Sequence, residues 1–91
     1  MSESAAGTVK LVYFAWVRER IGKPEETITP PAEVKTVADV IAWLMMRGEE
    51  YAYAFENGPL IRAAIDKSHV KHDTLIAGAG EIAFFPPMTG G

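Results

Sequence analysis

The first third of the chain has the hydrophobic pattern of two strands. Residues 9–17 are rich in β-branched and aromatic side chains, and they mix alternation with continuous apolarity, as a strand buried on both faces does. We therefore predict that this segment is the first strand and lies centrally in a sheet. Residues 18–24 then turn the chain, and residues 25–29 form a short polar strand that Pro30 and Pro31 end, so the two strands resemble a hairpin.

The hydrophobic period changes at Thr36, where we predict a helix. Apolar residues then recur at the spacing of one helix face, namely Val37, Val40, Ile41, Leu44 and Met45. Thr36 is a suitable N-cap with Asp39 three residues later, and Gly48 is a suitable C′ residue. Such a helix is expected to lie on a sheet and build the core, so its apolar residues need no cofactor role.

The remainder of the chain is predicted to add a helical turn and three strands. In chain order these are a turn of helix at 49–57, a strand at 60–65, a short strand at 68–70 and a last strand at 81–85. Asp66 and Lys67 form the turn between two of these strands. Gly78 and Gly80 serve a tight turn before the last strand, and a phosphate-binding loop is disfavoured because no helix or P-loop lysine follows.

This order of elements predicts the fold class. Two strands, one long helix and three more strands are what an α+β domain of the β-grasp (ubiquitin-like) type requires, with a mixed sheet of about five strands and one main helix packed across it. We expect a disordered N-terminal tail at residues 1–8, the β-grasp domain at residues 9–85 and a flexible C-terminal tail at residues 86–91.

Composition narrows the possible functions. The chain has 91 residues, 48% of them hydrophobic, a net charge of −3 and no cysteine. Without cysteine, a disulfide framework, a thiolate nucleophile and a Cys-ligated zinc site are excluded. His69 and His72 alone are an incomplete ligand set, so no metal is expected. Scattered Lys and Arg residues argue against a nucleic-acid partner, and the absence of a long apolar run or signal peptide indicates a cytoplasmic protein that does not enter a membrane.

The C-terminal segment suggests that the working group is the terminal carboxylate. Its residues are Pro86, Pro87, Met88, Thr89, Gly90 and Gly91. The prolines favour an extended exit from the domain, and the glycines give a thin backbone that a partner's narrow active-site channel can admit. This pattern predicts a carrier. The alternative is a frayed, glycine-rich end, which the proline pair next to an apolar strand makes less attractive.

Two motifs then give the chain a recognisable resemblance. Residues 14–19 read Phe-Ala-Trp-Val-Arg-Glu, and residues 84–91 read Phe-Phe-Pro-Pro-Met-Thr-Gly-Gly. With the predicted helix, they make residues 9–91 similar to the small subunits of molybdopterin synthase, a family of ubiquitin-like sulfur carriers. The second motif is the more specific, because a terminal Gly-Gly alone is shared by all sulfur carriers and many ubiquitin-like modifiers.

The resemblance implies a cycle of activation and sulfur transfer at Gly91. An adenylating and sulfurating enzyme uses ATP to convert the carboxylate into an acyl adenylate, which a sulfur donor converts into a thiocarboxylate. Residues 86–90 then enter the large, catalytic subunit, where sulfur passes to a cyclic pyranopterin precursor (precursor Z) and forms the molybdopterin dithiolene. The two kinds of subunit are expected to form a heterotetramer. This chain would bind no permanent cofactor and have no catalysis of its own.

The same resemblance suggests where partners dock. Phe14 and Phe85 match positions of an apolar patch used against both partners, although either ring could equally be an ordinary core residue. Arg18 could pair with a partner's acidic residue or be merely solvated. His69 stands where the family often has an apolar residue, and Asp66 where asparagine is common, so both can change the docking surface locally.

Three other functions remain open. Carriers that deliver sulfur to thiamine or another thiolated product share the Gly-Gly end but usually lack the Phe-Phe-Pro-Pro approach. A ubiquitin-like protein modifier would be joined through Gly91 to target lysines. A β-grasp binding module would not need its tail at all.

Overall fold

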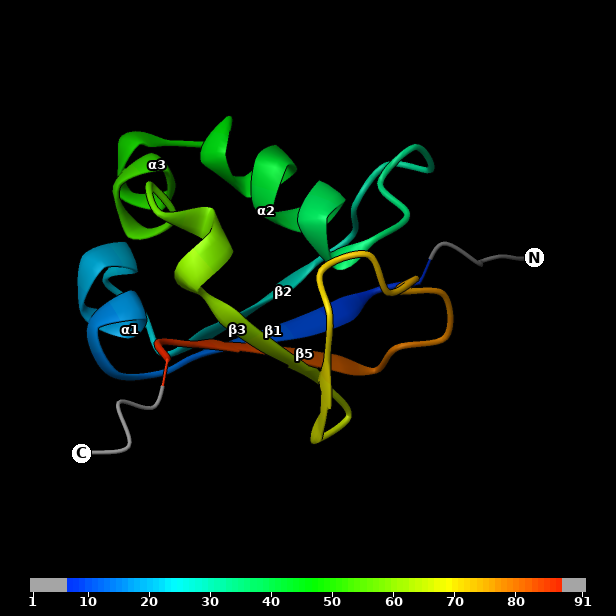
Figure 1. The fold of residues 1–91 in the computed structure, drawn as a ribbon. Coiled ribbons are helices and arrows are strands. Elements are labelled where there is room, and N and C mark those ends of the chain that lie inside the picture. Colours follow the sequence, from blue (N-terminus) through cyan, green and yellow to red (C-terminus); the bar gives the residue numbers. More distant parts are fainter. Residues whose placement is uncertain (1–6, 88–91) are drawn as a thin grey trace.

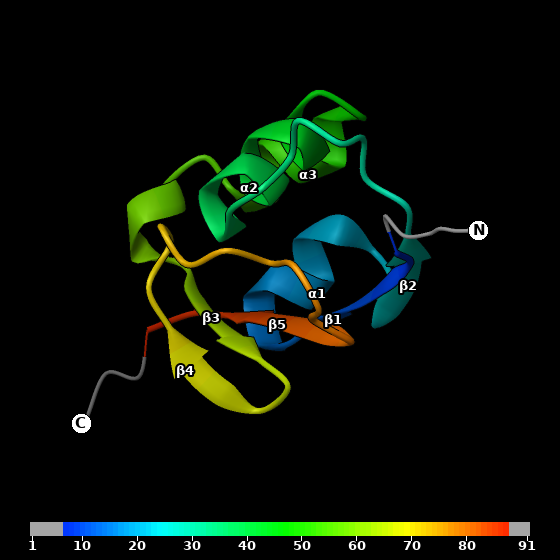
Figure 2. The ribbon, with the colours of Figure 1, turned by 90° about the vertical axis from the view of Figure 1, so that its right-hand side faces the viewer.

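The computed structural model describes residues 7–87. Its elements are β1 (Val9–Tyr13), α1 (Ala15–Ile21), β2 (Glu25–Ile28), α2 (Val37–Met45), α3 (Glu49–Ala54), a 3-10 helix (Gly58–Leu60), β3 (Arg62–Ile65), β4 (Ser68–Val70) and β5 (Glu81–Phe85). The strands form one mixed sheet in the order β2-β1-β5-β3-β4, in which β1 and β5 are parallel and the other neighbours antiparallel. In both views, α2 and α3 lie above one face of the sheet (Figure 1 and Figure 2). The predicted β-grasp fold is confirmed.

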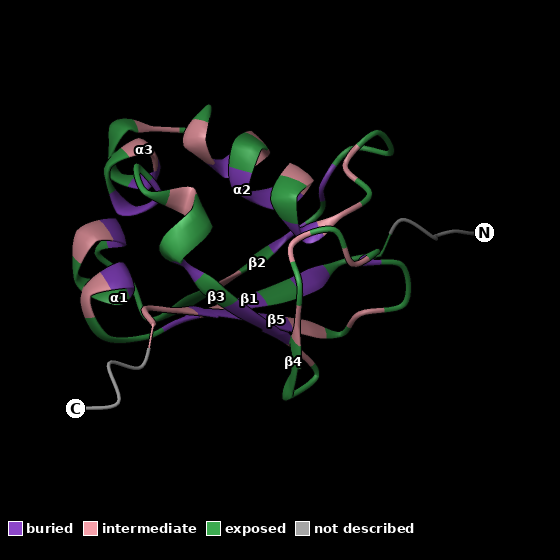
Figure 3. Cartoon of the chain, viewed as in Figure 1, coloured by how far each residue is buried: buried purple, intermediate pink, exposed green. Residues whose placement is uncertain are grey.

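The core lies between the helices and the sheet face that they cover (Figure 3). The predicted face of α2 is buried there, with Val40 and Leu44 fully inaccessible. The ring of Phe84 on β5 meets the ring of Phe55 edge-on, with 5.3 Å between the centroids. Alternate residues of each long strand face this core, because side chains point to opposite faces along a strand. One face of the sheet is therefore occupied by packing.

The predicted start of α2 is confirmed, but its predicted end is wrong. Thr36 is the N-cap: its hydroxyl accepts from the Asp39 N–H at 3.1 Å, and the Asp39 carboxylate accepts from the Thr36 N–H at 3.1 Å. This capping box satisfies N–H groups that have no partner inside the helix. The helix ends at Met45 with Met46 as C-cap. Gly48 is instead the N-cap of α3, which lies within the helical turn predicted at residues 49–57.

A prediction that the structure corrects is the single strand over residues 9–17. The strand stops at Tyr13, and the seven-residue helix α1 follows. Ala15 has a φ of 51°, which takes the chain out of the strand direction, and Gly22 with a φ of 91° ends the helix. Val17 and Ile21, one helical turn apart, are buried in the core. The apolar run is therefore shared by two elements, and β5, not β1, occupies the middle of the sheet.

The turn at Asp66 and Lys67 is confirmed, and it also holds a distant segment. Both residues have positive φ, 48° and 74°, as in the type I′ turns that close two-residue hairpins. The Asp66 carboxylate accepts hydrogen bonds from the backbone N–H of Glu81 at 3.0 Å and of Gly80 at 3.2 Å. The β3–β4 turn is thereby tied to the start of β5. Leu60, predicted to begin the strand, belongs to the 3-10 helix before β3.

A carboxylate on β2 connects several elements at one edge of the sheet. Glu26 accepts hydrogen bonds from the hydroxyls of Tyr13, at 2.7 Å, and of Tyr51. Lys23 and Arg47 lie 3.6 and 3.7 Å from the same carboxylate. Burial acts to raise the pKa of Glu26, but the two tyrosine hydrogen bonds and the cations outweigh it and lower the pKa. Burial and the bond to Glu26 raise the pKa of Tyr13.

Candidate functional site

The sheet face opposite α2 and α3 carries no helix among residues 7–87 (Figure 1). We call it the open face. Strand alternation assigns to it these strand residues outside the core cluster: Lys10, Val12, Glu25, Thr27, Arg62, Ala64, His69, Glu81, Ala83 and Phe85. Their neighbours Leu11, Ala63 and Phe84 face the core. The open face is thus available for contact with another protein.

The strand register sets these side chains in rows. Val12, Ala83, Ala64 and His69 form one row across β1, β5, β3 and β4. The two alanines are only 6% and 8% exposed although they lie outside the core cluster. Larger side chains beside them in the register screen such short side chains from solvent. The row therefore has a flat, apolar centre.

Phe85 is the next residue of β5 on the open face after Ala83, two positions further along the strand. Its ring and that of His69 are 5.3 Å apart between centroids and tilted by 56°. Phe85 is half-buried, and His69 is exposed. The structure therefore brings together two predicted docking residues that are 16 positions apart in the sequence.

Phe14 lies at the same end of the sheet. Because β1 and β5 are parallel, both strands finish there, and the Phe14 N–H donates to the Phe84 carbonyl at 3.1 Å. We call this the exit end, since Pro86 and Pro87 continue from it. The Phe14 side chain is 47% exposed, so the alternative that Phe14 is a core residue is wrong. Phe84, its hydrogen-bond partner in the backbone, fills the core instead.

Arg18 is one helical turn beyond Phe14. Its backbone N–H donates to the Phe14 carbonyl at 3.2 Å, and its side chain is exposed on α1. Within the part of the chain that the structure describes, Arg18 forms no ion pair. Pro86 and Pro87 are half-buried directly after Phe85. Residues 88–91, including the predicted thiocarboxylate position Gly91, lie outside the described residues, as do residues 1–6.

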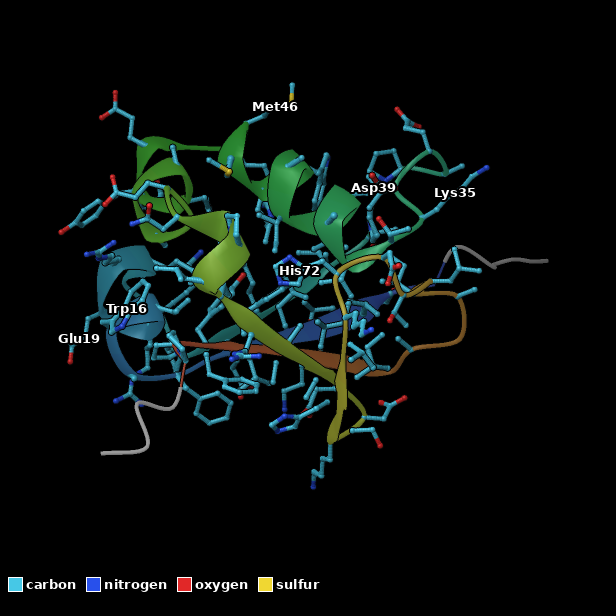
Figure 4. The ribbon with its side chains drawn as sticks, in the orientation of Figure 1. Trp16, Glu19, Lys35, Asp39, Met46 and His72 are labelled. Atoms are coloured by element: carbon cyan, nitrogen blue, oxygen red, sulfur yellow. The ribbon has the colours of Figure 1, made fainter. Side chains whose placement is uncertain are left out.

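The two histidines are not neighbours in a common site. The His72 side chain lies between α2 and the sheet (Figure 4), and its Nε2 is 2.6 Å from the Ile61 carbonyl, to which it donates. His69 faces the other side of the sheet. His72 thus ties the loop after β4 to the residue before β3.

Every helix within residues 7–87 is too short or too polar to cross a bilayer.

Reasoning from the sequence missed three residues of the open face. Arg62 is the register partner of Phe85, and Ala83 and Ala64 lie in the row between Val12 and His69. The sequence of one strand does not reveal which strands lie beside it. The only local signal was the alternation of residues 62–65, in which Ala63 and Ile65 are the core-facing pair. Which strand stood beside β3 became clear only from the register.

The fold and the exit end define a class of protein: a small ubiquitin-like β-grasp domain whose last strand ends beside an exposed aromatic surface. A family model described as the ThiS family matches residues 11–91. This chain therefore belongs to the ThiS family.

The similarity to known proteins extends over almost the whole chain. It is 34% identical over 83 residues to the molybdopterin synthase sulfur carrier subunit of Escherichia coli (strain K12), covering 91% of this chain and 99% of that protein. A solved structure assigned to subunit 1 of a molybdopterin converting factor from Pyrococcus furiosus superposes with a TM-score of 0.69 at 27% identity, covering 89% and 98%. Small archaeal modifier protein 1 from Methanosarcina acetivorans superposes with a TM-score of 0.68 at 26% identity, covering 92% and 96%. The resemblance to sulfur carrier subunits of molybdopterin synthase is thus confirmed.

Proposed function

We propose that this chain is the sulfur carrier subunit of a molybdopterin synthase and that Gly91 carries the sulfur. The observation that supports this most is the complete Phe-Phe-Pro-Pro-Met-Thr-Gly-Gly end, in a chain of which 91% matches 99% of a sulfur carrier subunit. The partner is then a large, catalytic subunit, with which this chain assembles as a heterotetramer.

The chemistry at Gly91 needs an activating enzyme, because a carboxylate is a poor electrophile. An oxygen of the Gly91 carboxylate attacks the α-phosphorus of ATP, pyrophosphate leaves, and an acyl adenylate forms. Sulfide, as HS⁻, then attacks the acyl carbon, the bond from that carbon to the AMP oxygen breaks, and AMP departs with the former carboxylate oxygen. Loss of the remaining S–H proton leaves the thiocarboxylate, with no change in the oxidation state of sulfur. In the large subunit, the thiocarboxylate sulfur attacks a carbon of the pyranopterin precursor and displaces an oxygen substituent, which gives a thioester. Water then cleaves the acyl C–S bond, so the sulfur stays on the pterin and Gly91 returns as a carboxylate.

The role of this chain is to deliver and position the reacting group. Phe14 and Phe85 give an apolar contact at the exit end, and an exposed apolar patch of this kind is suited to protein docking. His69, against the Phe85 ring, and Arg18, one turn beyond Phe14, lie at its border. A partner held there is close to Pro86 and Pro87. If residues 86–91 enter the partner in an extended conformation, they would span about 20 Å.

Intact mass spectrometry tests the carrier role. The chain is incubated with ATP, an adenylating enzyme of this family and a sulfide source, beside a variant that lacks Gly90 and Gly91. The expected result is a mass increase equal to the replacement of one oxygen by sulfur, in the full chain only. If a control carrier gains sulfur and the full chain does not, the proposal fails.

The small archaeal modifier protein among the similar structures favours one second candidate. In that case, Gly91 would form an isopeptide bond with lysines of other proteins. Affinity-tagged chain expressed in its own cells would then appear in covalent adducts of higher mass that survive denaturation. The sulfur carrier proposal instead expects noncovalent copurification of the large subunit.

A further inference from the structure

An arginine stands beside the aromatic residues of the exit end. Arg62 begins β3 and is the direct antiparallel partner of Phe85, so the two side chains leave the same face of the sheet next to each other. Arg62 is exposed. Within residues 7–87 its guanidinium takes part in no ion pair.

The acidic residues near this surface do not balance its charge. Glu25 is paired with Lys10 at 3.5 Å, and the Asp66 carboxylate accepts the backbone N–H groups of Gly80 and Glu81. Glu81 itself begins β5, and four residues of strand place it about 13 Å from Phe85. The chain has a net charge of −3, yet the described residues at the exit end of the open face include the cations Arg62 and Lys71, and none of the acidic residues named above balances them.

The nearest acidic residue on α1 does not change this arrangement. Glu19 extends from α1 away from the sheet (Figure 4). Arg20, which follows it, is already paired with Glu56 at 3.3 Å. Within residues 7–87, three exposed cations near the exit end take part in no ion pair: Arg18 on α1, Arg62 at the start of β3 and Lys71 directly after β4. Of these, Arg62 is the one whose strand lies directly beside Phe85.

We infer that Arg62 is a specificity-determining docking residue, which selects a partner surface that presents a carboxylate beside apolar side chains. This inference rests on the proposed function, since the occupant to which it commits is the catalytic large subunit. A guanidinium is planar and weakly hydrated, so it can bind a carboxylate through two parallel hydrogen bonds. The neighbouring Phe85 ring and the alanine-lined row keep water from one side of that pair, which strengthens it relative to a fully solvated one.

The test is binding of the purified cognate large subunit to charge variants, measured by titration calorimetry at low and high salt. Arg62→Glu is expected to weaken binding by about tenfold or more, because truncating or reversing one member of a partly desolvated pair costs affinity directly. Arg62→Gln should weaken it less and flatten its salt dependence. Lys35→Glu is the matched control: it makes the same charge change on an exposed residue at the start of α2, far from the exit end (Figure 4).

A charge swap then locates the carboxylate. Asp and Glu residues on the large subunit are changed to Arg one at a time, and one such variant should restore the affinity of Arg62→Glu while weakening that of the unchanged chain. Equal thermal midpoints of all variants would establish that folding is retained, as expected for an exposed side chain; Arg62→Gln gives the same comparison if Arg62→Glu does not fold.

The outcomes separate this inference from the proposed function. Failure of the unchanged chain to bind the large subunit would count against the proposed function itself. The inference alone would be overturned if the unchanged chain binds the large subunit and Arg62→Glu binds it equally tightly. It would also be overturned if Arg62→Glu loses no more affinity than Lys35→Glu does. An Arg62→Glu variant that slows thiocarboxylate formation by the adenylating enzyme but binds the large subunit normally would overturn it too, because the selected partner would then be the wrong one.

Discussion

The backbone of Gly22 shows how a single residue sets local structure. Its φ of 91° ends α1, and its N–H donates to the Arg18 carbonyl at 2.8 Å. A Cβ at this position would meet no atom within 4 Å, so only backbone strain opposes a side chain. We expect Gly22→Ala to lower the free energy of unfolding by about 1 kcal/mol, measured by urea denaturation. Gly58→Ala is the control: a Cβ there is equally free of contacts, and its φ is not positive, so stability should hardly change.

Glu26 gives the molecule a pH dependence whose sign follows from its lowered pKa. The carboxylate form, which accepts the hydroxyls of Tyr13 and Tyr51, is favoured in the folded state. Its stabilising contribution is therefore fully present above the ordinary carboxyl pKa of 4.5 and is lost as the pH falls through the lower folded pKa.

Comparison with Glu26→Gln measures that contribution. The amide keeps one acceptor oxygen but not the charge, so we expect a loss of about 1–2 kcal/mol near neutral pH. The difference between the two proteins should shrink in acid, below the pH at which the carboxylate is protonated. A difference that stays constant, or grows, as the pH falls below 4 would contradict this sign. Glu25→Gln, on the same strand but exposed, should show a much smaller difference throughout.

At the scale of the elements, the Arg20 side chain of α1 connects α1 to α3. The Arg20 guanidinium lies 4.5 Å from the Trp16 ring centroid and 4.2 Å from that of Tyr53. Two such contacts at about 0.5–1 kcal/mol each predict that Arg20→Ala lowers the free energy of unfolding by about 1–2 kcal/mol. Arg20→Lys keeps the charge but not the planar stacking, so its free energy of unfolding should lie between those of Arg20→Ala and the unchanged chain. A loss no larger than that of Arg18→Ala, whose side chain is exposed, would rule out the stacking contribution.

The elements also differ in how far the sequence could predict them. α2 was predictable because its signals are local: the Thr36–Asp39 capping box and an apolar face at helical spacing lie within ten residues. α1 was not, because its two buried residues, Val17 and Ile21, span a single turn and follow an apolar strand without a polar break. A run of this length fits both periods, and only packing against α3 and β5 decides between them.

The candidate site was predictable only where a motif marked it. Phe14 and Phe85 were placed by resemblance, whereas their orientation required the structure. Arg62 received no attention in the sequence, because its position beside Phe85 depends on the pairing of β3 with β5 across 23 residues. Such long-range register cannot be read from either strand alone.

At the scale of the whole molecule, the parallel pairing of β1 and β5 explains why the motif at residues 14–19 begins beside the motif at residues 84–91. Parallel neighbours finish at the same end of a sheet, so the residue after the first strand, Phe14, and the last residue of the final strand, Phe85, become neighbours there. Within residues 7–87, the helices lie on one face of the sheet and the opposite face carries none (Figure 1). The segment that leaves the domain at Pro86 therefore starts beside the proposed docking residues.

This arrangement assigns stability and docking to adjacent residues of one strand. Phe84 faces the core and is 0% exposed, whereas Phe85 lies half-buried on the open face. Phe84→Ala should lower the free energy of unfolding by about 3–5 kcal/mol, the usual cost of removing a buried ring. Phe85→Ala should cost far less stability but weaken binding of the large subunit and slow sulfur transfer. Denaturant unfolding and calorimetry on both variants test this separation. If Phe85→Ala unfolds as readily as Phe84→Ala, the proposed separation of stability from docking is wrong. If Phe85→Ala binds the large subunit as tightly as the unchanged chain, Phe85 is not part of the docking surface.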